Sequence, residues 1–454
     1  ETTTPAALPV DPALLIPIPI VDGRPELPES WPIAEPLTWM LDALTTGEID
    51  PDDAATRFNA GFLAAVPIEQ ITGLVTSLAA DNPTLDVVEI VFLTPISARV
   101  MLGDPAATQG FLLDLSVEHS TGLVSGAVIN PFPYQDGNTA PADASLGVDD
   151  LVGRLQETAT EVGAVMARID GGSCTPIEGH DEEVALATGS QFKGWILGAL
   201  ATAVEDGELS LDTPVVVTDS ERAPGSVTDD IVAGTELTLL DAAVLMMGNS
   251  DNTMTDHLHE LVGREAVEAF VAESGHADPD LLTPFVSVNE WDNLIFSISA
   301  DDAATYLAGA NDEQRTFLDQ VIVPMGAARQ GGFANTDVTL DLSWNASAMD
   351  LCRLMARLRQ FEAGTEARRL IDQAYGAGGV LAGVRRNWDL TWYKGGGIPT
   401  ADGAGLDVLT HGWMVEDTTG AYAVVVLSNG GPVDEFASAS VAQRLHRLLR
   451  DSAS

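Results

Sequence analysis

Lys193 and Lys394 are the only lysines in this chain of 454 residues, and each belongs to a short motif that could do chemistry. Lys193 closes the tetrad Ser190-Gln-Phe-Lys193, and Lys394 opens the triplet Lys394-Gly-Gly. Between them lies Ser250-Asp-Asn252, so the motifs run SxxK, SDN and KGG along the chain. Arginine stays protonated, whereas a buried lysine can lose its proton and act as a base. The two lysines therefore indicate positions where an amine is needed.

Together these residues predict nucleophilic catalysis by a serine. Ser190 is expected in the first turn of a helix, where backbone N–H groups and the helix dipole stabilise a developing oxyanion. Lys193 follows one turn later on the same face and, when neutral, could take the Ser190 proton. Lys394 is the expected second cation that lowers the pKa of Lys193. Ser250 would bridge the two amines and pass the proton to the leaving group. Asn252 would hold Lys193 and a substrate amide.

The third motif predicts a strand edge along which a substrate binds. Gly395, Gly396 and Gly397 carry no side chains, so a substrate backbone could lie along the end of this strand. We expect the Gly397 N–H to complete an oxyanion hole with that of Ser190. Tyr393 directly precedes the motif and is expected to line the substrate site.

Each motif alone is a weak signal. An SxxK tetrad can mark a helix start with a solvated lysine, SDN a turn or an N-cap, and KGG a loop. Their order and the absence of any other lysine favour one shared site. No CxxC pair or Cys/His cluster is present, so the sequence predicts neither a metal nor a cofactor. Cys174 and Cys352 are the only cysteines, and the sequence leaves open whether the fold brings them close enough to pair.

The elements that must position these motifs are predicted to form two α+β domains. Residues 1–30 are rich in proline and are expected to be extended. Residues 31–143 show helical periodicity and then strand-like runs, which predicts helices on one face of an antiparallel sheet. Residues 144–454 begin with two predicted strands, the second at Glu183–Ala187, and continue with a helical block, three strands and a closing helix. The turn-rich stretch 130–141 is the predicted boundary.

The composition argues against several classes of partner. The chain has 21 basic and 68 acidic residues, a formal charge of −47, which repels nucleic acid and anionic lipid headgroups. No apolar run approaches the roughly 20 residues of a membrane-spanning helix. The chain starts at Glu1 without Met, and its Thr- and Pro-rich opening resembles a tether. We therefore expect an exported protein of the cell envelope or medium, with a lipid anchor upstream of residue 1 as one form of attachment. The expected partner is a small molecule, and the oligomeric state stays open.

With these motifs in this order, residues 145–454 resemble the serine β-lactamase and penicillin-binding protein superfamily. The resemblance implies a class A β-lactamase-like domain, with an antiparallel sheet flanked by helices and an all-helical subdomain. It also implies an acylating serine and its helpers at Ser190, Lys193, Ser250, Asn252 and Lys394. Residues 31–143 resemble the α+β cone of nuclear-transport-factor and steroid-isomerase-like (NTF2-like) domains. The combination is similar to an actinobacterial two-domain family that includes the cephalosporin esterase of the clavulanic acid cluster and mycobacterial lipoproteins.

The chain departs from that family's pattern at two points. A class A β-lactamase activates its deacylating water with a Glu that is followed four residues later by an Asn. Here the nearest pair is Glu290 and Asn293, three residues apart, and an ordinary polar loop is the alternative interpretation. Gly395 stands where a hydroxyl residue usually binds the lactam carboxylate. His411, on the strand after the KGG motif, could border the site or be an ordinary strand histidine.

These two departures from the β-lactamase pattern decide how the functional hypotheses are ranked. We expect a serine hydrolase with an acyl-enzyme on Ser190, an esterase on acylated or β-lactam-like small molecules with weak or no β-lactamase activity. One alternative is a β-lactamase or D-Ala-D-Ala peptidase, and another is a non-catalytic protein that binds β-lactams or peptidoglycan fragments. The lysines favour the enzyme hypotheses, because binding alone would tolerate arginine. The N-terminal domain shows no acid–base pair and is expected to be a scaffold or lid.

Overall fold

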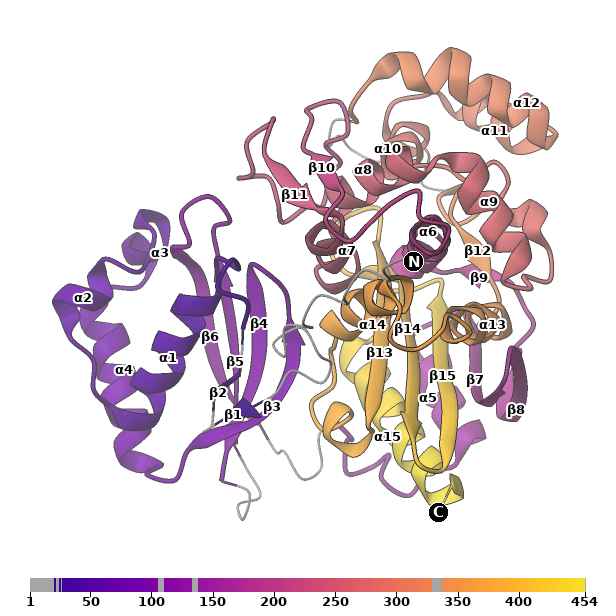
Figure 1. Cartoon of the computed structure of the whole chain (residues 1–454). Helices are drawn as coiled ribbons and strands as arrows, with labels where there is room; N and C mark the ends of the chain where they lie inside the picture. Colours follow the sequence, from indigo (N-terminus) through magenta and orange to yellow (C-terminus); the bar gives the residue numbers. More distant parts are fainter. Residues whose placement is uncertain are drawn as a thin grey trace, which may run out of the picture. The chain divides into compact units, whose positions relative to one another are not determined.

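The computed structural model describes residues 20–21, 24–25, 27–104, 110–132, 138–328, 335 and 338–453. The chain divides into two compact units, residues 1–132 and 133–454 (Figure 1). Most of the predicted extended segment, residues 1–30, lies outside the described residues.

The N-terminal unit places helices against a four-stranded antiparallel sheet in the order β3-β4-β5-β6 (Figure 1). Asp50 and Asn59 accept hydrogen bonds from the first free N–H groups of α2 and α3 and so fix the starts of these helices. This is the predicted α+β arrangement, and its likeness to an NTF2-like cone stays a prediction. The helices are α1 (Ala34–Thr46), α2 (Pro51–Ala55), α3 (Ala60–Ala65) and α4 (Ile68–Asp81), and the strands are β1 (Ile20–Val21), β2 (Arg24–Pro25), β3 (Asp86–Leu93), β4 (Ser97–Gly103), β5 (Gly110–Val117) and β6 (Val124–Phe132).

The C-terminal unit is built on a five-stranded antiparallel sheet in the order β13-β14-β15-β7-β8. The final strand β15 pairs with β7, so the two ends of the unit meet in the middle of one sheet. β13, which carries the KGG motif, is an edge strand, so one side of its backbone is not used by the sheet. The strands are β7 (Glu161–Asp170), β8 (Ser173–His180), β9 (Leu186–Ala187), β10 (Pro214–Val216), β11 (Glu236–Thr238), β12 (Asn345–Ala346), β13 (Leu390–Pro399), β14 (Leu406–Asp417) and β15 (Gly420–Asn429).

Helices cover both faces of this sheet (Figure 1). On one face α5 and α15 bury apolar side chains such as Leu151 and Leu445 against Trp413 and Val424. On the other face α13 packs on β7 and β15, while α14 packs on β13 and on α6 and α7 of the helical block. The helices are α5 (Val148–Gln156), α6 (Lys193–Glu205), α7 (Leu239–Gly248), α8 (Asn252–Val262), α9 (Arg264–Glu273), α10 (Val288–Phe296), α11 (Ala300–Ala308), α12 (Asn311–Phe317), α13 (Ala348–Arg359), α14 (Glu366–Ala377) and α15 (Glu435–Ala453).

One predicted strand is wrong. The second strand of the unit is β8 at Ser173–His180, and only Leu186–Ala187 of the predicted run is strand. β8 is an exposed edge strand, so its sequence lacks the apolar alternation that marks a half-buried strand. β8 also settles the cysteine question, because Cys174 and Cys352 form a disulfide that joins it to α13 across a Cα separation of 6.2 Å.

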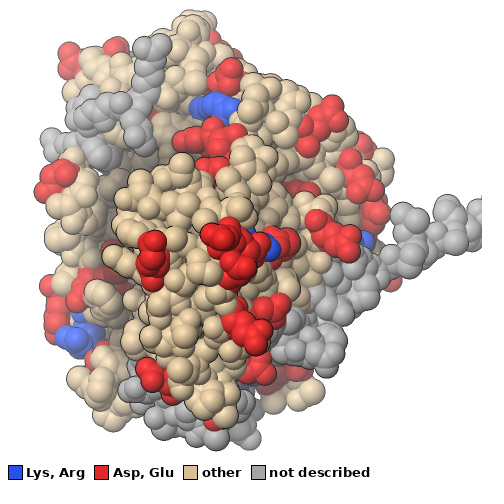
Figure 2. Space-filling view, turned by 90° about the vertical axis from the view of Figure 1, so that its left-hand side faces the viewer, with Lys and Arg blue, Asp and Glu red and all other residues tan. Residues whose placement is uncertain are grey.

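The surface carries the acidic character of the composition. Asp and Glu side chains are spread over the face drawn in Figure 2, where Lys and Arg side chains are few. In the part of the chain that the structure describes, no helix is both long enough and apolar enough to cross a membrane.

Candidate active site

Ser190 lies in a single 3-10 turn, Gly189–Phe192, that runs directly into α6. Two glycines allow this turn to pack against the edge strand β13. Gly189 has a φ of +52°, and a Cβ atom on it would lie 2.7 Å from the Gly397 nitrogen. A Cβ atom on Gly396 would lie 2.6 Å from the Ser190 nitrogen. The backbone of Ser190 therefore lies against the KGG strand, as the predicted oxyanion hole requires.

The two lysines converge on one hydroxyl group. Lys394 Nζ donates to Ser250 Oγ at 2.9 Å and to the Gly395 carbonyl at 2.7 Å. Lys193 Nζ lies 3.3 Å from the same Ser250 Oγ, and it donates to the Ser250 carbonyl at 2.6 Å and to Asn252 Oδ1 at 2.7 Å. Lys193 is fully buried and Lys394 is 3% exposed. The three motifs thus meet in one buried cluster.

The backbone conformation of Ser250 is unusual, and it allows the residue to contact the lysines. Its φ is +57°, a left-handed conformation that is uncommon outside glycine. The residue forms the turn between α7 and α8, and the turn directs both its carbonyl and its hydroxyl at Lys193. Asp251 holds the turn, because its Oδ1 caps α8 at the Met254 N–H and its Oδ2 accepts hydrogen bonds from Val227 and Thr228.

Burial makes at least one of the amines a usable base. It lowers the pKa of Lys193 to about 7, although the nearby carboxyl groups of Asp251, Asp256 and Asp292 raise it. Burial and the neighbouring Lys193 also lower the pKa of Lys394 well below its usual value. At neutral pH a large fraction of Lys193 is therefore uncharged, as a general base must be.

Ser190 itself is not yet bonded to its predicted base. Within the described residues, the Lys193 amine makes its hydrogen bonds to Ser250 and Asn252 and none to the Ser190 hydroxyl. The 3.3 Å contact with Ser250 Oγ is the longest of the three, so it is the one most easily exchanged for Ser190. Catalytic hydrogen bonds are often long before substrate binds.

Sequence reasoning missed two buried carboxyl groups near Lys193. Burial raises the pKa of Asp256 to about 7 and that of Asp292 to about 8. Asp256 accepts hydrogen bonds from the Val288 and Asn289 N–H groups at 2.7 and 2.8 Å, which ties the start of α10 to α8. Asp292 Oδ2 has no hydrogen-bond partner among the described residues.

Glu290, the predicted counterpart of a deacylating Glu, has a different neighbourhood. It pairs with Arg264 at 2.6 Å, and its second oxygen accepts from the Ser287 N–H at 2.8 Å in a capping box at the start of α10. Asp292, two residues later on the same helix, is the carboxyl of this stretch that raises the Lys193 pKa. The sequence of this stretch offers several acids, and only the folded helix shows that Asp292 is the one that acts on the lysine.

Tyr393 and His411 lie on the other face of the sheet from Lys394. Tyr393 pairs with Trp413 and Gly395 with His411 in the β13–β14 register, and side chains alternate along a strand. Tyr393 Oη and His411 Nδ1 are 2.9 Å apart, and the Tyr393 ring packs on Trp413 with centroids 4.8 Å apart. Neither residue joins the lysine cluster. A side chain at Gly395 would collide with the Tyr393 hydroxyl, which explains the glycine there.

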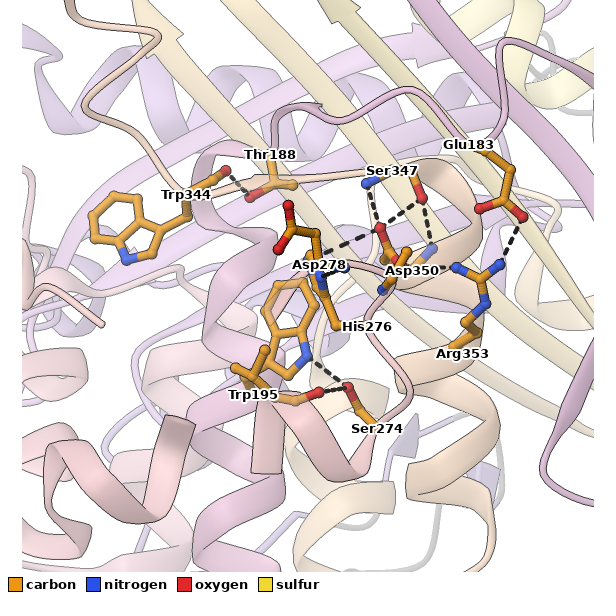
Figure 3. Close-up of polar contacts among 12 residues, drawn as sticks. Glu183, Thr188, Trp195, Ser274, His276, Asp278, Trp344, Ser347, Asp350 and Arg353 are labelled. Carbon is orange, nitrogen blue, oxygen red and sulfur yellow. Dashed lines mark hydrogen bonds and ion pairs between the residues drawn. The ribbon is translucent and has the colours of Figure 1, made fainter. Parts of the chain in front are cut away.

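A second layer of polar contacts fixes the segment that leads into Ser190 (Figure 3). Thr188 Oγ1 donates to the Trp344 carbonyl at 2.9 Å, two residues before the nucleophile. Trp195 Nε1 donates to Ser274 Oγ at 3.0 Å and ties α6 to α9 (Figure 3). Asp350 is the centre of a further set of hydrogen bonds, to the hydroxyl and backbone N–H of Ser347, the backbone N–H of Ala277 and the guanidinium of Arg353 (Figure 3).

Together these groups have the chemistry needed for acyl transfer. They supply a serine at a helix start, an amine that is partly neutral at pH 7 and a hydroxyl that contacts two amines. Among the described residues, no group of three or more His, Cys, Asp or Glu side chains could hold a metal ion.

Comparison with known proteins gives a family match over part of the chain and several similar solved structures. The family model described as the beta-lactamase enzyme family matches residues 148–370. No curated protein matches the chain. A β-lactamase from Chitinophaga pinensis is similar in structure, with 19% identity and a TM-score of 0.46 over 67% of this chain and 98% of that chain. A β-lactamase from Sphaerobacter thermophilus gives 17% identity and a TM-score of 0.44 over 68% and 98%. The protein PBP-A gives 14% and 0.42 over 67% and 96%.

The matched residues include the SxxK and SDN motifs, and the sheet that carries the KGG motif completes the same unit. Over residues 148–370 the C-terminal unit is therefore similar to the beta-lactamase enzyme family.

Proposed function

We propose that this protein is a serine hydrolase that forms an acyl-enzyme on Ser190. The observation that carries the proposal is the convergence of two buried lysine amines on the Ser250 hydroxyl. A single buried amine already costs free energy, because burial disfavours its charged form. Two amines at one hydroxyl are therefore hard to explain as packing, whereas they are what a proton relay needs.

In the proposed reaction, neutral Lys193 accepts the Ser190 proton while Ser190 Oγ attacks the substrate carbonyl. The N–H groups of Ser190 and Gly397 stabilise the oxyanion that forms. Ser250 then gives its proton to the leaving group and recovers one from the protonated amines beside it. Water completes the cycle by releasing the acyl group from Ser190. Lys394 holds the Ser250 hydroxyl in place, and the neighbouring Lys193 lowers the pKa of Lys394.

Two features support an ester, or an acylated β-lactam-like compound, as the substrate, with weak or no β-lactamase activity. Glu290 is held by Arg264 and by its own helix cap, so it is poorly placed to activate a deacylating water. Gly395 offers no hydroxyl group for a lactam carboxylate. An ester without a carboxylate has no use for a hydroxyl group at position 395, and a small acyl group leaves Ser190 more readily than a bulky ring-opened lactam.

The second candidate is a β-lactamase or D-Ala-D-Ala peptidase, which the family match favours. The third, a non-catalytic protein that binds β-lactams or peptidoglycan fragments, is less well supported, because binding does not require two amines with lowered pKa values. For the whole chain we propose a place near the actinobacterial two-domain family, with an NTF2-like N-terminal scaffold or lid. The Cys174–Cys352 disulfide supports export, because disulfides persist in oxidising compartments.

A cephalosporin with a 3-acetoxymethyl group tests these candidates in one assay. An esterase releases acetate and leaves the lactam ring intact, whereas a β-lactamase opens the ring, which can itself expel the acetate. The two products can then have the same mass, so the ultraviolet absorbance of the intact lactam ring system is the measurement that separates them. We expect acetate release, and hydrolysis of a 4-nitrophenyl ester, to be lost in Ser190→Ala. Unchanged hydrolysis in that variant would overturn the proposal, and rapid ring opening would favour the second candidate.

A further inference from the structure

The segment that leads into Ser190 is attached to the main sheet by side chains. Its strand β9 pairs with β12 and not with the five-stranded sheet. Asn429, at the end of β15, accepts the Ala187 N–H at 2.8 Å and donates to the Ala187 carbonyl at 3.0 Å. Thr410, on β14, binds the next residue, because its Oγ1 donates to the Thr188 carbonyl at 2.7 Å. Two side chains thus connect this segment to two strands of the sheet.

The Thr188 carbonyl is the first acceptor of the 3-10 turn that contains Ser190. The Gln191 N–H donates to this carbonyl at 3.4 Å, which is long for such a bond, whereas the Thr410 hydroxyl donates at 2.7 Å. The same hydroxyl lies 3.4 Å from the Gly396 carbonyl, but it has only one proton to donate. At its start the turn is therefore held more firmly by Thr410 than by its own backbone.

Thr410 and Gly396 form a complementary pair beside this turn. They are opposite each other in the β13–β14 register, so side chains at these positions share one face of the sheet. A Cβ atom on Gly396 would collide with the Thr188 carbonyl oxygen, and it would lie 2.6 Å from the Ser190 nitrogen and 2.7 Å from the Thr410 hydroxyl. The glycine provides the space into which the turn fits, and the threonine provides the hydrogen bond that keeps the turn there.

Both residues of this hydrogen bond are shielded from water. Thr410 and Thr188 are fully buried. The Thr188 hydroxyl has its own acceptor, the Trp344 carbonyl at 2.9 Å (Figure 3). Burying a hydroxyl group costs free energy unless the group is hydrogen-bonded, and Thr410 meets this condition through the Thr188 carbonyl. Loss of the Thr410 hydroxyl would leave the carbonyl with only its long bond from Gln191.

We propose that Thr410 is a positioning residue for the oxyanion hole. By holding the Thr188 carbonyl, it fixes the backbone that leads to the Ser190 N–H. That N–H is one of the two groups, with the N–H of Gly397, that stabilise the oxyanion in the proposed reaction. The inference rests on the proposed acyl-enzyme reaction and adds a residue that acts through the backbone rather than on the reacting atoms.

The variant Thr410→Val tests the proposal, because it removes the hydroxyl group and keeps a branched side chain. Loss of one oxyanion-hole donor costs about 100- to 1000-fold in kcat, and a displaced donor costs less. We therefore expect kcat/KM for a 4-nitrophenyl ester to fall about tenfold or more. Thr410→Ser keeps the hydroxyl group and should restore most of the activity.

Two measurements separate positioning from a general loss of structure. Phenylboronic acid adds to a serine hydroxyl as a tetrahedral adduct that resembles the oxyanion, so its affinity for Thr410→Val should fall by the same factor as kcat/KM. The rise of kcat/KM with pH should keep its midpoint, because Lys193 makes its hydrogen bonds to Ser250 and Asn252. An unchanged affinity for phenylboronic acid, or a shifted midpoint, would overturn the inference.

Thr391→Val is the matched control. Thr391 is also a buried strand threonine, on β13, but its hydroxyl has no hydrogen-bond partner among the described residues. We expect this variant to keep wild-type activity and wild-type affinity for phenylboronic acid. A thermal melt shows whether each variant is folded. Should Thr410→Val fail to fold, Thr410→Ala replaces it with the same expected loss, because alanine places no methyl group against the carbonyl.

Ser190→Ala separates this inference from the proposed function. If that variant loses hydrolysis while Thr410→Val keeps wild-type activity, only the inference is overturned. Equal losses in Thr410→Val and Thr391→Val would also overturn it, because they would indicate a general effect on the sheet. If Ser190→Ala keeps full hydrolysis, the proposed function is overturned, and with it the oxyanion hole that Thr410 would position.

Discussion

Lys394 Nζ donates a 2.9 Å hydrogen bond to Ser250 Oγ, although the two residues are 144 positions apart in the chain. The bond connects the edge strand of the sheet to the turn before α8, so it forms only when the sheet and the helical block are assembled. It also places the second amine next to the hydroxyl that Lys193 contacts. The proposed proton relay therefore depends on the Lys394–Ser250 hydrogen bond, which joins the KGG motif to the SDN motif.

Arginine should not replace the amine of Lys394. The guanidinium group is larger and stays charged, so it would restore the charge but neither the geometry at Ser250 nor a loss of the proton. We expect kcat/KM of Lys394→Arg for a 4-nitrophenyl ester to fall by about 100-fold or more, the range that general acid–base groups contribute. A melting curve checks that the variant is folded. Activity within a factor of two of wild type would contradict the role given to this lysine.

The pH dependence of activity should report the state of Lys193. Its pKa is lowered to about 7, and only the uncharged amine can accept the Ser190 proton, so kcat/KM should rise as the pH increases through about 7. A pH profile of kcat/KM for a 4-nitrophenyl ester measures this rise. A profile that is flat through about pH 7 would contradict the role of Lys193 as the base.

Asp292 should lower the stability of the folded protein at alkaline pH. Burial raises its pKa from 3.8 to about 8. Between these values the folded protein keeps a proton that the unfolded chain has released, so the contribution of this group to stability falls as the pH rises. At about pH 9 we expect the free energy of unfolding of Asp292→Asn to be about 1–3 kcal/mol higher than that of wild type. At about pH 4 we expect the two proteins to have the same free energy of unfolding. Urea unfolding at both pH values measures this, and a variant that is less stable at high pH would refute it.

The close approach of Gly396 to the nucleophile gives a steric prediction. A Cβ atom on Gly396 would lie 2.6 Å from the Ser190 nitrogen, whereas one on Gly397 would first meet Leu406 at an ordinary 3.6 Å. Gly396→Ala should therefore lower both the melting temperature and the activity. Gly397→Ala should leave the melting temperature close to wild type. Equal melting temperatures for the two variants would mean that the Ser190 turn is not packed on β13 as described.

The disulfide should carry a measurable part of the stability of the C-terminal unit. It links residues 178 positions apart, so it restricts a large part of the unfolded chain. Cys352→Ser should lower the free energy of unfolding by about 2–4 kcal/mol, the usual range for a native disulfide. A reducing agent should lower the melting temperature of wild type toward that of the variant and should not change the variant. A reductant-insensitive wild type would contradict the pairing.

The main elements could be predicted because local and periodic signals mark them. The helix Arg264–Glu273 has apolar residues at helical spacing, and α7 begins at Thr238, a residue type that commonly caps helices and caps this one. The three motifs also met at one site, because rare residue types in a fixed order leave few alternatives. β8 was missed for a physical reason, since an exposed edge strand has no buried face to impose alternation on its sequence.

Side-chain direction was harder to predict than position. Tyr393 is adjacent to Lys394 in sequence, yet strand alternation sends it to the opposite face of the sheet. Glu290 and Asp292 lie on one short helix, and its rotation decides which of them acts on Lys193. The sequence could not predict the disulfide, because only the assembled fold brings the Cα atoms of Cys174 and Cys352 to 6.2 Å from each other.

Peptide mapping of a trapped acyl-enzyme tests the central claim most directly. The protein would be mixed with an activated ester, quenched in acid and digested, and the modified residue identified by mass spectrometry. We predict a single acyl group on Ser190, which is absent in Ser190→Ala and formed much more slowly in Lys193→Arg. An acyl group on any other residue, or equal labelling of the Lys193→Arg variant, would contradict the account.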